Sequence, residues 1–465
     1  MSADLESIYA YMPRFVQNLA CTYEGTRIRR SRYNAEFMLM LLAGEERCRW
    51  SAEQFTHYRD CLLQQYILHC SETVPYFRAG FRDWGVEPQS IRTLEDLQAI
   101  PVLKKSEFTG HAASLESEAV DARSCITCHT SGTTGNGLRF RTSRQAYREQ
   151  WAVWWRFRRW HGIDLNTKCA YFGGRSIVPI SQNNPPFWRY DHARQHILFS
   201  GYHMSAQTLP AYIQELRRQR APWISGYPSL LALLATRMVE TGSDLGYSPR
   251  WVTTLAENLL PSQKAAITKA FGVVPRQHYG MAEGAANISE CEIGRLHVDE
   301  DFSAVEFIPE PEIDGCRVVG TAFLNPATAF VRYEVGDLAR ISTDSSCPCG
   351  RPGRLIEALD GRLEDYVARH DGSMVGRMDH IFKDLVNVRE AQIFQEAPGQ
   401  VSIRIVRGLL YRSADEKRLR SEISKRLGND MDVRIEYWDS IPRGPGGKLR
   451  FVISTLHKSK ITRGA

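Results

Sequence analysis

Long apolar runs are missing from this 465-residue sequence, and no segment approaches the ~20 apolar residues that cross a bilayer. The N-terminus carries Asp4 and Glu6 where a secretory signal would place basic and then apolar residues. A long basic run is also absent, and the formal net charge of +6 is small for this length. These absences predict a cytoplasmic protein that has neither a membrane nor a nucleic acid as partner.

A disulfide framework is disfavoured as well. The 11 cysteines are an odd number scattered along the chain, which favours free thiols and metal ligands. Apolar residues make up 43% and charged residues 24%, as in ordinary globular proteins. The length suits two or three packed domains.

Hydrophobic periodicity predicts helices in the first 120 residues, where Ser51 and Gln54 form a capping box before an apolar stripe. Thr93 and Asp96 are expected to open another short helix that ends before Pro101. From about residue 168 to 345, short apolar runs alternate with helical stretches, which is an α/β pattern.

The C-terminal region has a different pattern. Two apolar runs within residues 401–438 flank one helix, for which Ser413 and Glu416 predict a capping box and Gly428 an end. We therefore predict an α/β fold: a large N-terminal α/β domain with an irregular β-barrel portion, residues 1–360, and a small mobile α+β domain, residues 361–465.

The segment richest in glycine and hydroxyl side chains runs from Thr130 to Gly137. Glycines let backbone amides turn inward, and hydroxyls add donors, so the segment favours a phosphate-binding loop. It lacks the lysine of a Walker loop, which disfavours a P-loop NTPase. A merely flexible loop is the alternative reading.

Residues 130–135, Thr-Ser-Gly-Thr-Thr-Gly, resemble the phosphate loop of the adenylate-forming superfamily of acyl-CoA synthetases, luciferases and peptide-synthetase adenylation domains. Four segments resemble later motifs of that family in the same order: 279–283 (Tyr-Gly-Met-Ala-Glu), 332–337 (Arg-Tyr-Glu-Val-Gly-Asp), 361–365 (Gly-Arg-Leu-Glu-Asp) and 442–450 (Pro-Arg-Gly-Pro-Gly-Gly-Lys-Leu-Arg). Residues 74–77, 97–105, 226–229 and 347–351 resemble the phenylacetate-CoA ligase branch. The ordered set identifies the chain as a member of this superfamily.

The resemblance implies a role for each matched residue. The ATP phosphates would bind Thr130, Ser131, Gly132, Thr133, Thr134 and Gly135. The adenine would lie against Tyr279 and Gly280, and the ribose would bind Asp337 with support from Arg362. Glu283 would hold Mg²⁺, and Lys448 would bridge the substrate carboxylate and the α-phosphate. Glu364 or Asp365 would be the hinge between the domains.

Three departures from the family pattern bear on the second half-reaction. Asn136-Gly137-Leu138 carries no cation, Ala282 replaces a threonine, and residues 370–387 lack a clear match to the turn near pantetheine. Transfer of the acyl group to CoA is expected, while transfer to an amine or AMP transfer to a hydroxyl are alternatives. A non-catalytic, zinc-braced scaffold is the rival outside enzymes.

Cys291, His297, Cys347 and Cys349 supply four soft or borderline ligands that match a closed structural zinc site. Some proteins similar to phenylacetate-CoA ligase hold zinc at such a pattern, and unpaired thiols in a turn are the alternative. Cys125 and Cys128 are interpreted as packing thiols.

The aromatic and basic residues 147–160 are interpreted as core packing with arginines that reach out to solvent. His203 is expected to be a satisfied histidine. The expected cofactors are ATP, Mg²⁺ and structural Zn²⁺, with CoA as an acceptor. The expected partner is a small carboxylic acid, with an aryl acid favoured by the aromatic residues near 200–285, and a homodimer is left open.

Overall fold

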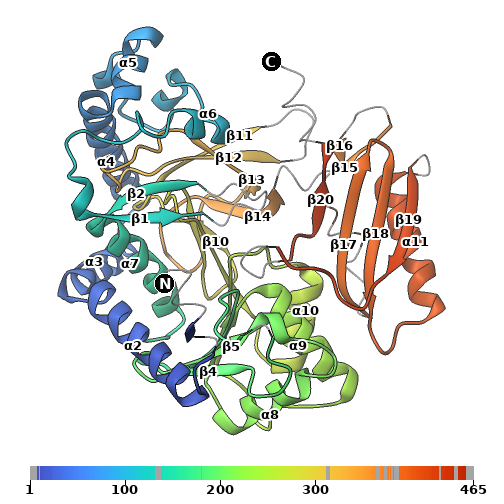
Figure 1. Ribbon diagram of the computed structural model, residues 1–465. Helices are drawn as coiled ribbons and strands as arrows, with labels where there is room; N and C mark the ends of the chain where they lie inside the picture. The colour runs from blue at the N-terminus through green and yellow to red at the C-terminus, as the bar shows by residue number, and fades with distance from the viewer. Residues whose placement is uncertain are drawn as a thin grey trace. The chain divides into compact units, whose positions relative to one another are not determined.

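The computed structural model describes residues 8–9, 11–130, 138–179, 181–309, 315–362, 367–370, 374–375, 378, 381, 387–428, 431–444 and 449–456 (Figure 1). The chain forms two compact units. Unit 1 comprises Met1–Arg30, Ile163–Gln277 and Glu364–Ala465, and unit 2 comprises Ser31–Gly162 and His278–Leu363.

Unit 2 combines helices with antiparallel strands. Its helices are α3 (Ala35–Arg47), α4 (Ala52–Thr73), α5 (Pro75–Trp84), α6 (Lys105–Gly110) and α7 (Arg144–Trp160). A hairpin joins β1 (Cys125–His129) to β2 (Arg139–Ser143). The remaining strands pair in the order β11 (Ala304–Pro309), β12 (Cys316–Thr321), β13 (Tyr333–Ile341), β14 (Leu355–Arg362), β10 (Leu296–Val298), β9 (Asn287–Glu290) and β8 (Arg276–Gly280).

The predicted capping box at the start of α4 is confirmed. The Gln54 amide donates to Ser51 Oγ at 3.2 Å, and the Ser51 amide donates to Gln54 Oε1 at 2.9 Å. The expected helix at Thr93 is only a 3₁₀ turn, Asp96–Ala99. Reciprocal bonds between Thr93 and Asp96 start this turn as predicted, and it is short because the chain becomes extended at Ile100, the residue before Pro101.

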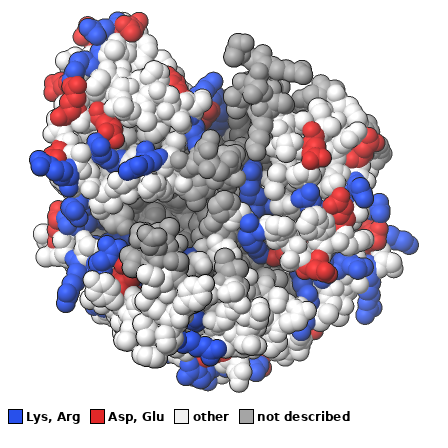
Figure 2. Space-filling view, viewed as in Figure 1, with Lys and Arg blue, Asp and Glu red and all other residues white. Residues whose placement is uncertain are grey.

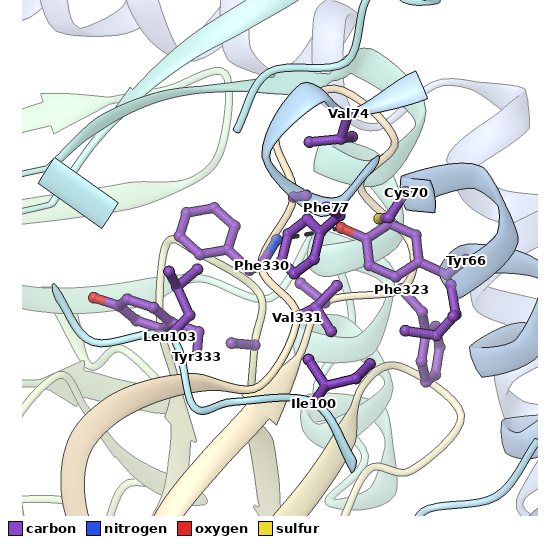
Figure 3. Packing of buried hydrophobic residues seen from close by; sticks show 14 of the residues in the cluster. Tyr66, Cys70, Val74, Phe77, Ile100, Leu103, Phe323, Phe330, Val331 and Tyr333 are labelled. Atoms are coloured by element: carbon purple, nitrogen blue, oxygen red, sulfur yellow. Dashed lines mark hydrogen bonds between the residues drawn. The ribbon is translucent and has the colours of Figure 1, made fainter. Parts of the chain in front are cut away.

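The main core of unit 2 anchors the start of β13 (Figure 3). The Phe330 amide donates to the hydroxyl oxygen of Tyr66 at 3.3 Å, and the Phe330 ring stacks on Phe108 with centroids 4.7 Å apart. Backbone bonds between Leu103 and Arg332 (2.9 Å) and between Glu334 and Leu103 (3.0 Å) clamp the same strand. Each large apolar side chain buried here contributes about 1.5–3 kcal/mol. Residues 332–337 therefore have a rigid base.

Unit 1 contains the predicted α/β pattern. Strands β7 (Trp251–Leu255), β6 (Trp223–Gly226), β3 (Cys169–Gly173) and β5 (His196–Ser200) pair in parallel, and β4 (Trp188–Asp191) adds an antiparallel edge. Three helices bury their apolar faces in a core shared with these strands: α8 (Leu209–Gln219), α9 (Pro228–Thr241) and α10 (Pro261–Phe271). Helix α2 (Arg14–Arg32) precedes all of these elements in the sequence.

The C-terminal part of unit 1 is the predicted small α+β structure. Its sheet order is β19 (Asp432–Tyr437), β18 (Gln400–Arg407), β17 (Val388–Ala397) and β20 (Val452–Ser454), and β15 (Val367–Ala368) pairs with β16 (Met374–Val375). Helix α11 (Ser413–Leu427) packs against this sheet, as Figure 1 shows. The cap was predicted wrongly by one residue, because the Asp415 carboxylate accepts from the Arg412 amide at 2.8 Å.

On the face shown in Figure 2, Lys and Arg side chains are interspersed with Asp and Glu. None of the helices in the described part of the chain combines the length and the apolar character needed to span a bilayer.

Candidate functional site

Three of the residues predicted to bind ATP converge in unit 2. Tyr279, near the end of β8, donates its hydroxyl to Asp337 Oδ2 on β13 at 2.6 Å. Asp337 is the register partner of Arg362 at the end of β14. Gly336, just before Asp337, has a φ of 80°, which a glycine adopts without strain. The fold thus brings together residues from three motifs.

The glycine after Tyr279 is required by close packing. A Cβ at Gly280 would lie 2.6 Å from Asn287 Oδ1 and 2.9 Å from Trp154 Nε1. Trp154 donates its indole N–H to that same Asn287 oxygen at 2.9 Å. Any larger residue would force the Asn287 and Trp154 side chains to shift, so Gly280 lets these side chains pack closely beside Tyr279.

Thr130 closes the base of the predicted phosphate loop. Its amide donates to the Leu138 carbonyl at 3.0 Å, and its hydroxyl accepts from the Leu138 amide at 2.8 Å. The β1–β2 register continues directly into this pair. The other predicted phosphate ligands, Ser131, Gly132, Thr133, Thr134 and Gly135, lie outside the described residues.

Glu283, the predicted Mg²⁺ ligand, lies in the turn after β8. It borders a cavity of about 20 Å³, which has room for about one water molecule, together with Thr142, Gln150 and Ala282. The Gln150 side-chain amide donates to the Met281 carbonyl and so holds the turn. Glu283 therefore has a fixed backbone position beside the predicted nucleotide residues.

The predicted catalytic lysine, Lys448, and the predicted hinge residues, Glu364 and Asp365, lie outside the described residues. Leu449, the residue after the lysine, is described, and its contacts in unit 1 are given below.

The predicted metal ligands come together. One ligand atom from each of Cys291, His297, Cys347 and Cys349 lies within 4.8 Å of all the others. The Cys291 and Cys347 sulfurs are 3.8 Å apart, and Cys349 Sγ is 3.4 Å from His297 Nε2. Two thiolates on a tetrahedral Zn²⁺ with Zn–S bonds of about 2.3 Å also lie about 3.8 Å apart. The geometry fits zinc and is far too open for a disulfide.

Local structure prepares this cluster for a metal. His297 Nδ1 is 3.2 Å from the Pro352 carbonyl, which can only accept, so the lone pair of Nε2 faces the thiols. Gly350, with a φ of 76°, makes the turn that presents Cys347 and Cys349. Burial opposes ionisation of Cys291, yet its interaction with His297 and hydrogen bonds from backbone amides lower its pKa to about 6. A thiolate is the form that binds metal.

A buried ionic network beside this cluster was not predicted. Arg156 on α7 donates to Asp299 Oδ1 at 2.6 Å and to Asp301 Oδ2 at 2.5 Å, and Arg47 also contacts Asp301 at 2.7 Å. The expectation that the arginines of residues 147–160 all reach solvent is therefore wrong for Arg156, because two carboxylates compensate its charge inside the protein.

The histidine expected to be satisfied has two partners. His203 contacts Ser200 Oγ at 2.7 Å and the Pro179 carbonyl at 3.1 Å, which is a structural role.

Sequence and structure comparisons bear on these observations. Residues 367–455 match the family CapK C-terminal domain. The chain is 23% identical over 473 residues to the protein CapK of Staphylococcus aureus, covering 97% of this chain and 100% of that one. It is 25% identical over 442 residues to a phenylacetate-coenzyme A ligase of Thermus thermophilus, covering 84% and 94%.

Among solved structures, a 2-hydroxyisobutyryl-CoA ligase bound to an acyl-AMP matches with a TM-score of 0.68 and 18% identity, covering 90% of this chain and 93% of that one. This match confirms the predicted fold. Together with the sequence relatives, it bears out the predicted resemblance to the adenylate-forming superfamily, in the branch similar to phenylacetate-CoA ligase. The predicted class, an ATP-dependent and AMP-forming ligase, is confirmed at this level.

Proposed function

We propose that this protein activates a small carboxylic acid with ATP, releases pyrophosphate and then transfers the acyl group from the adenylate to CoA. The observation that carries the proposal is the hydrogen bond between Tyr279 and Asp337 beside the turn of Glu283, with the backbone of Arg362 paired opposite Asp337. A ribose with two hydroxyls needs a carboxylate acceptor, and an adenine needs a flat apolar face. This arrangement offers both.

The chemistry explains which residue types are needed. A carboxylate attacking an α-phosphate joins two anions, so the site must supply fixed cations and donors more than a general base. In this proposal Glu283 binds Mg²⁺, Lys448 contacts the substrate carboxylate and the α-phosphate, and residues 130–135 bind the remaining phosphates. Glu364 or Asp365 is the pivot that lets the C-terminal domain serve both half-reactions.

Zinc has a separate, structural role in this proposal. The four ligands leave no open coordination position, so Zn²⁺ would tie β9, β10 and the turn of residues 347–350 together without touching substrate. These strands lie next to β8 and β14, which carry Tyr279 and Arg362.

An acid panel tests the function directly. Purified protein is incubated with ATP, Mg²⁺ and single acids, including aryl acids, and pyrophosphate release is measured with no acceptor, with CoA or with an amine. Acid-dependent release that gives a thioester with CoA supports the proposal. If product forms only with the amine, the acceptor is an amine and not CoA. A stable AMP product that forms without consuming CoA points to AMP transfer. No acid-dependent release would overturn the assignment.

A further inference from the structure

Glu257 connects two elements of unit 1 through its two carboxylate oxygens. Oε2 accepts from the Ser229 amide at 3.0 Å, in the first turn of α9. Oε1 accepts from the Leu449 amide at 3.0 Å. The second bond reaches the residue that directly follows Lys448. None of the sequence motifs singled out Glu257.

The backbone is specifically shaped to present this carboxylate. Ala256, the preceding residue, has a φ of 67°, in the region that residues with a side chain rarely adopt. Such strain persists only where surrounding contacts hold it, and it clusters at functional positions. Ala256 ends the run that begins with β7 and turns Glu257 toward α9 and the C-terminal segment.

A second tie holds the other end of the lysine segment. Arg443 donates to Ser229 Oγ at 2.7 Å, and it also pairs with Glu390. Glu390 in turn accepts from the Ile441 amide at 3.1 Å. The first turn of α9 thus contacts the chain on both sides of residues 445–448.

The opposite end of α9 makes an independent contact with the same domain. Glu240, whose side chain is only 4% exposed, pairs with Arg389 at 2.7 Å and accepts from the Leu409 amide at 2.9 Å. Because Glu240 already attaches the C-terminal part of the chain to α9, the bond from Glu257 is not needed for attachment. Its effect falls on the segment next to Lys448.

We propose that Glu257 is a positioning residue that fixes the Lys448 segment for acid activation and must release the Leu449 amide before the acyl group is transferred. The inference rests on the proposed function for its kinetic part, while the contact itself can be tested without any substrate. Glu257 touches no reacting atom in this account and acts through the backbone at residue 449.

Glu257→Gln is the sharpest variant, because it keeps the shape and replaces one acceptor oxygen by an N–H₂ group. One of the two amides, Ser229 or Leu449, then meets a donor. Glu257→Asp is the second variant, since it keeps the charge but is one methylene too short to span both amides. Glu396→Gln, an exposed glutamate on β17, is the matched control.

The substrate-free readout is hydrogen exchange of the peptide that contains Leu449 in the full-length protein. We expect both Glu257 variants to exchange about 10-fold faster there, since a bond to a charged acceptor is lost, while the control stays at the parental rate. Unchanged exchange in both variants would overturn the contact, whatever the enzyme assays show.

The kinetic readout separates positioning from general damage. Acid-dependent pyrophosphate release should fall about 10-fold in kcat with the KM for ATP within about 2-fold, and transfer from preformed acyl-adenylate should stay at or above the parental rate. Equal losses in both steps with a lower unfolding temperature would overturn the positioning role. If exchange changes as expected but parental protein activates no acid, the proposed function fails and the contact remains.

Discussion

Tyr279 donates its hydroxyl to the carboxylate of Asp337 across 58 positions of sequence, at 2.6 Å. The motif of Tyr279 is expected to contact adenine and the motif of Asp337 to contact ribose. The hydrogen bond therefore joins the two motifs into one structural unit. The tyrosine fixes the orientation of the carboxylate that is expected to meet the ribose hydroxyls.

Tyr279→Phe should therefore weaken ATP binding without removing the flat ring. Loss of one hydrogen bond to a charged group is expected to raise the KM for ATP by about 10-fold, with a smaller effect on kcat. The assay is pyrophosphate release at varied ATP, and Tyr202→Phe is the control because that hydroxyl contacts only the Gly174 carbonyl among the bonds described. If the KM for ATP stays at the parental value in both Tyr279→Phe and Asp337→Asn, this pair does not contribute to nucleotide binding.

Zinc content gives a test that needs no substrate. The parent protein should retain about one zinc per chain through gel filtration, measured by elemental analysis, and Cys347→Ser with Cys349→Ser should lose it, because two of four ligands are removed. The double variant should also unfold at a lower temperature. Cys61→Ser with Cys125→Ser is the matched control. Full zinc in the ligand variant, or none in the parent, would contradict the site.

Acid sensitivity should come in part from His278. Burial, together with the charges of Arg158 and Arg156, lowers its pKa to about 3, whereas an unfolded histidine titrates near 6.5. The unfolded state therefore binds more protons between these values, so stability is lost as pH falls below about 6.5. At about pH 5.5 the loss from this group is about 1.4 kcal/mol.

The measurement is the fall in unfolding temperature between pH 7 and pH 5.5. We expect a smaller fall in His278→Gln than in the parent, because glutamine does not titrate. His57→Gln, at an exposed position, should behave as the parent does. An equal fall in all three proteins would show that His278 contributes nothing to acid sensitivity.

Local signals made much of the site predictable. Gly280 and Gly336 belong to short motifs in which glycine itself indicates a special backbone position. The spacing of Cys347 and Cys349 predicts a turn that can present two sulfurs to one metal ion. Arg156 could not be assigned, since its partner Asp301 is 145 positions away and only tertiary packing brings them together. Glu257 was missed for the same reason, because a single glutamate after a strand carries no pattern.

The hinge prediction concerns Glu364 and Asp365, at which the backbone is expected to change its angles between the two half-reactions. Proline at either position restricts φ and should block one step while sparing the other. Adenylation is measured by pyrophosphate release. Transfer is measured by thioester formation from preformed acyl-adenylate. Parental rates for both steps in both proline variants would exclude rotation at this point.

Lys448 carries the most direct test of catalysis. Its ammonium is expected near the α-phosphate only while the acid is being activated, and it stabilises charge that grows in the transition state. Lys448→Ala should lower adenylation by about 10²-fold or more, with ATP binding nearly unchanged. Lys417→Ala, an exposed lysine on α11, should remain at the parental rate.

Whether Lys448→Ala slows adenylation alone or both half-reactions distinguishes a catalytic role from damaged folding. Transfer from preformed acyl-adenylate to CoA should stay close to the parental rate in Lys448→Ala, because no phosphate bond forms in that step and the lysine has left the site. Equal loss of both steps would point to damaged folding, which the unfolding temperature would show. Unchanged adenylation would remove Lys448 from the mechanism and, with it, the reason for Glu257 to hold the neighbouring amide.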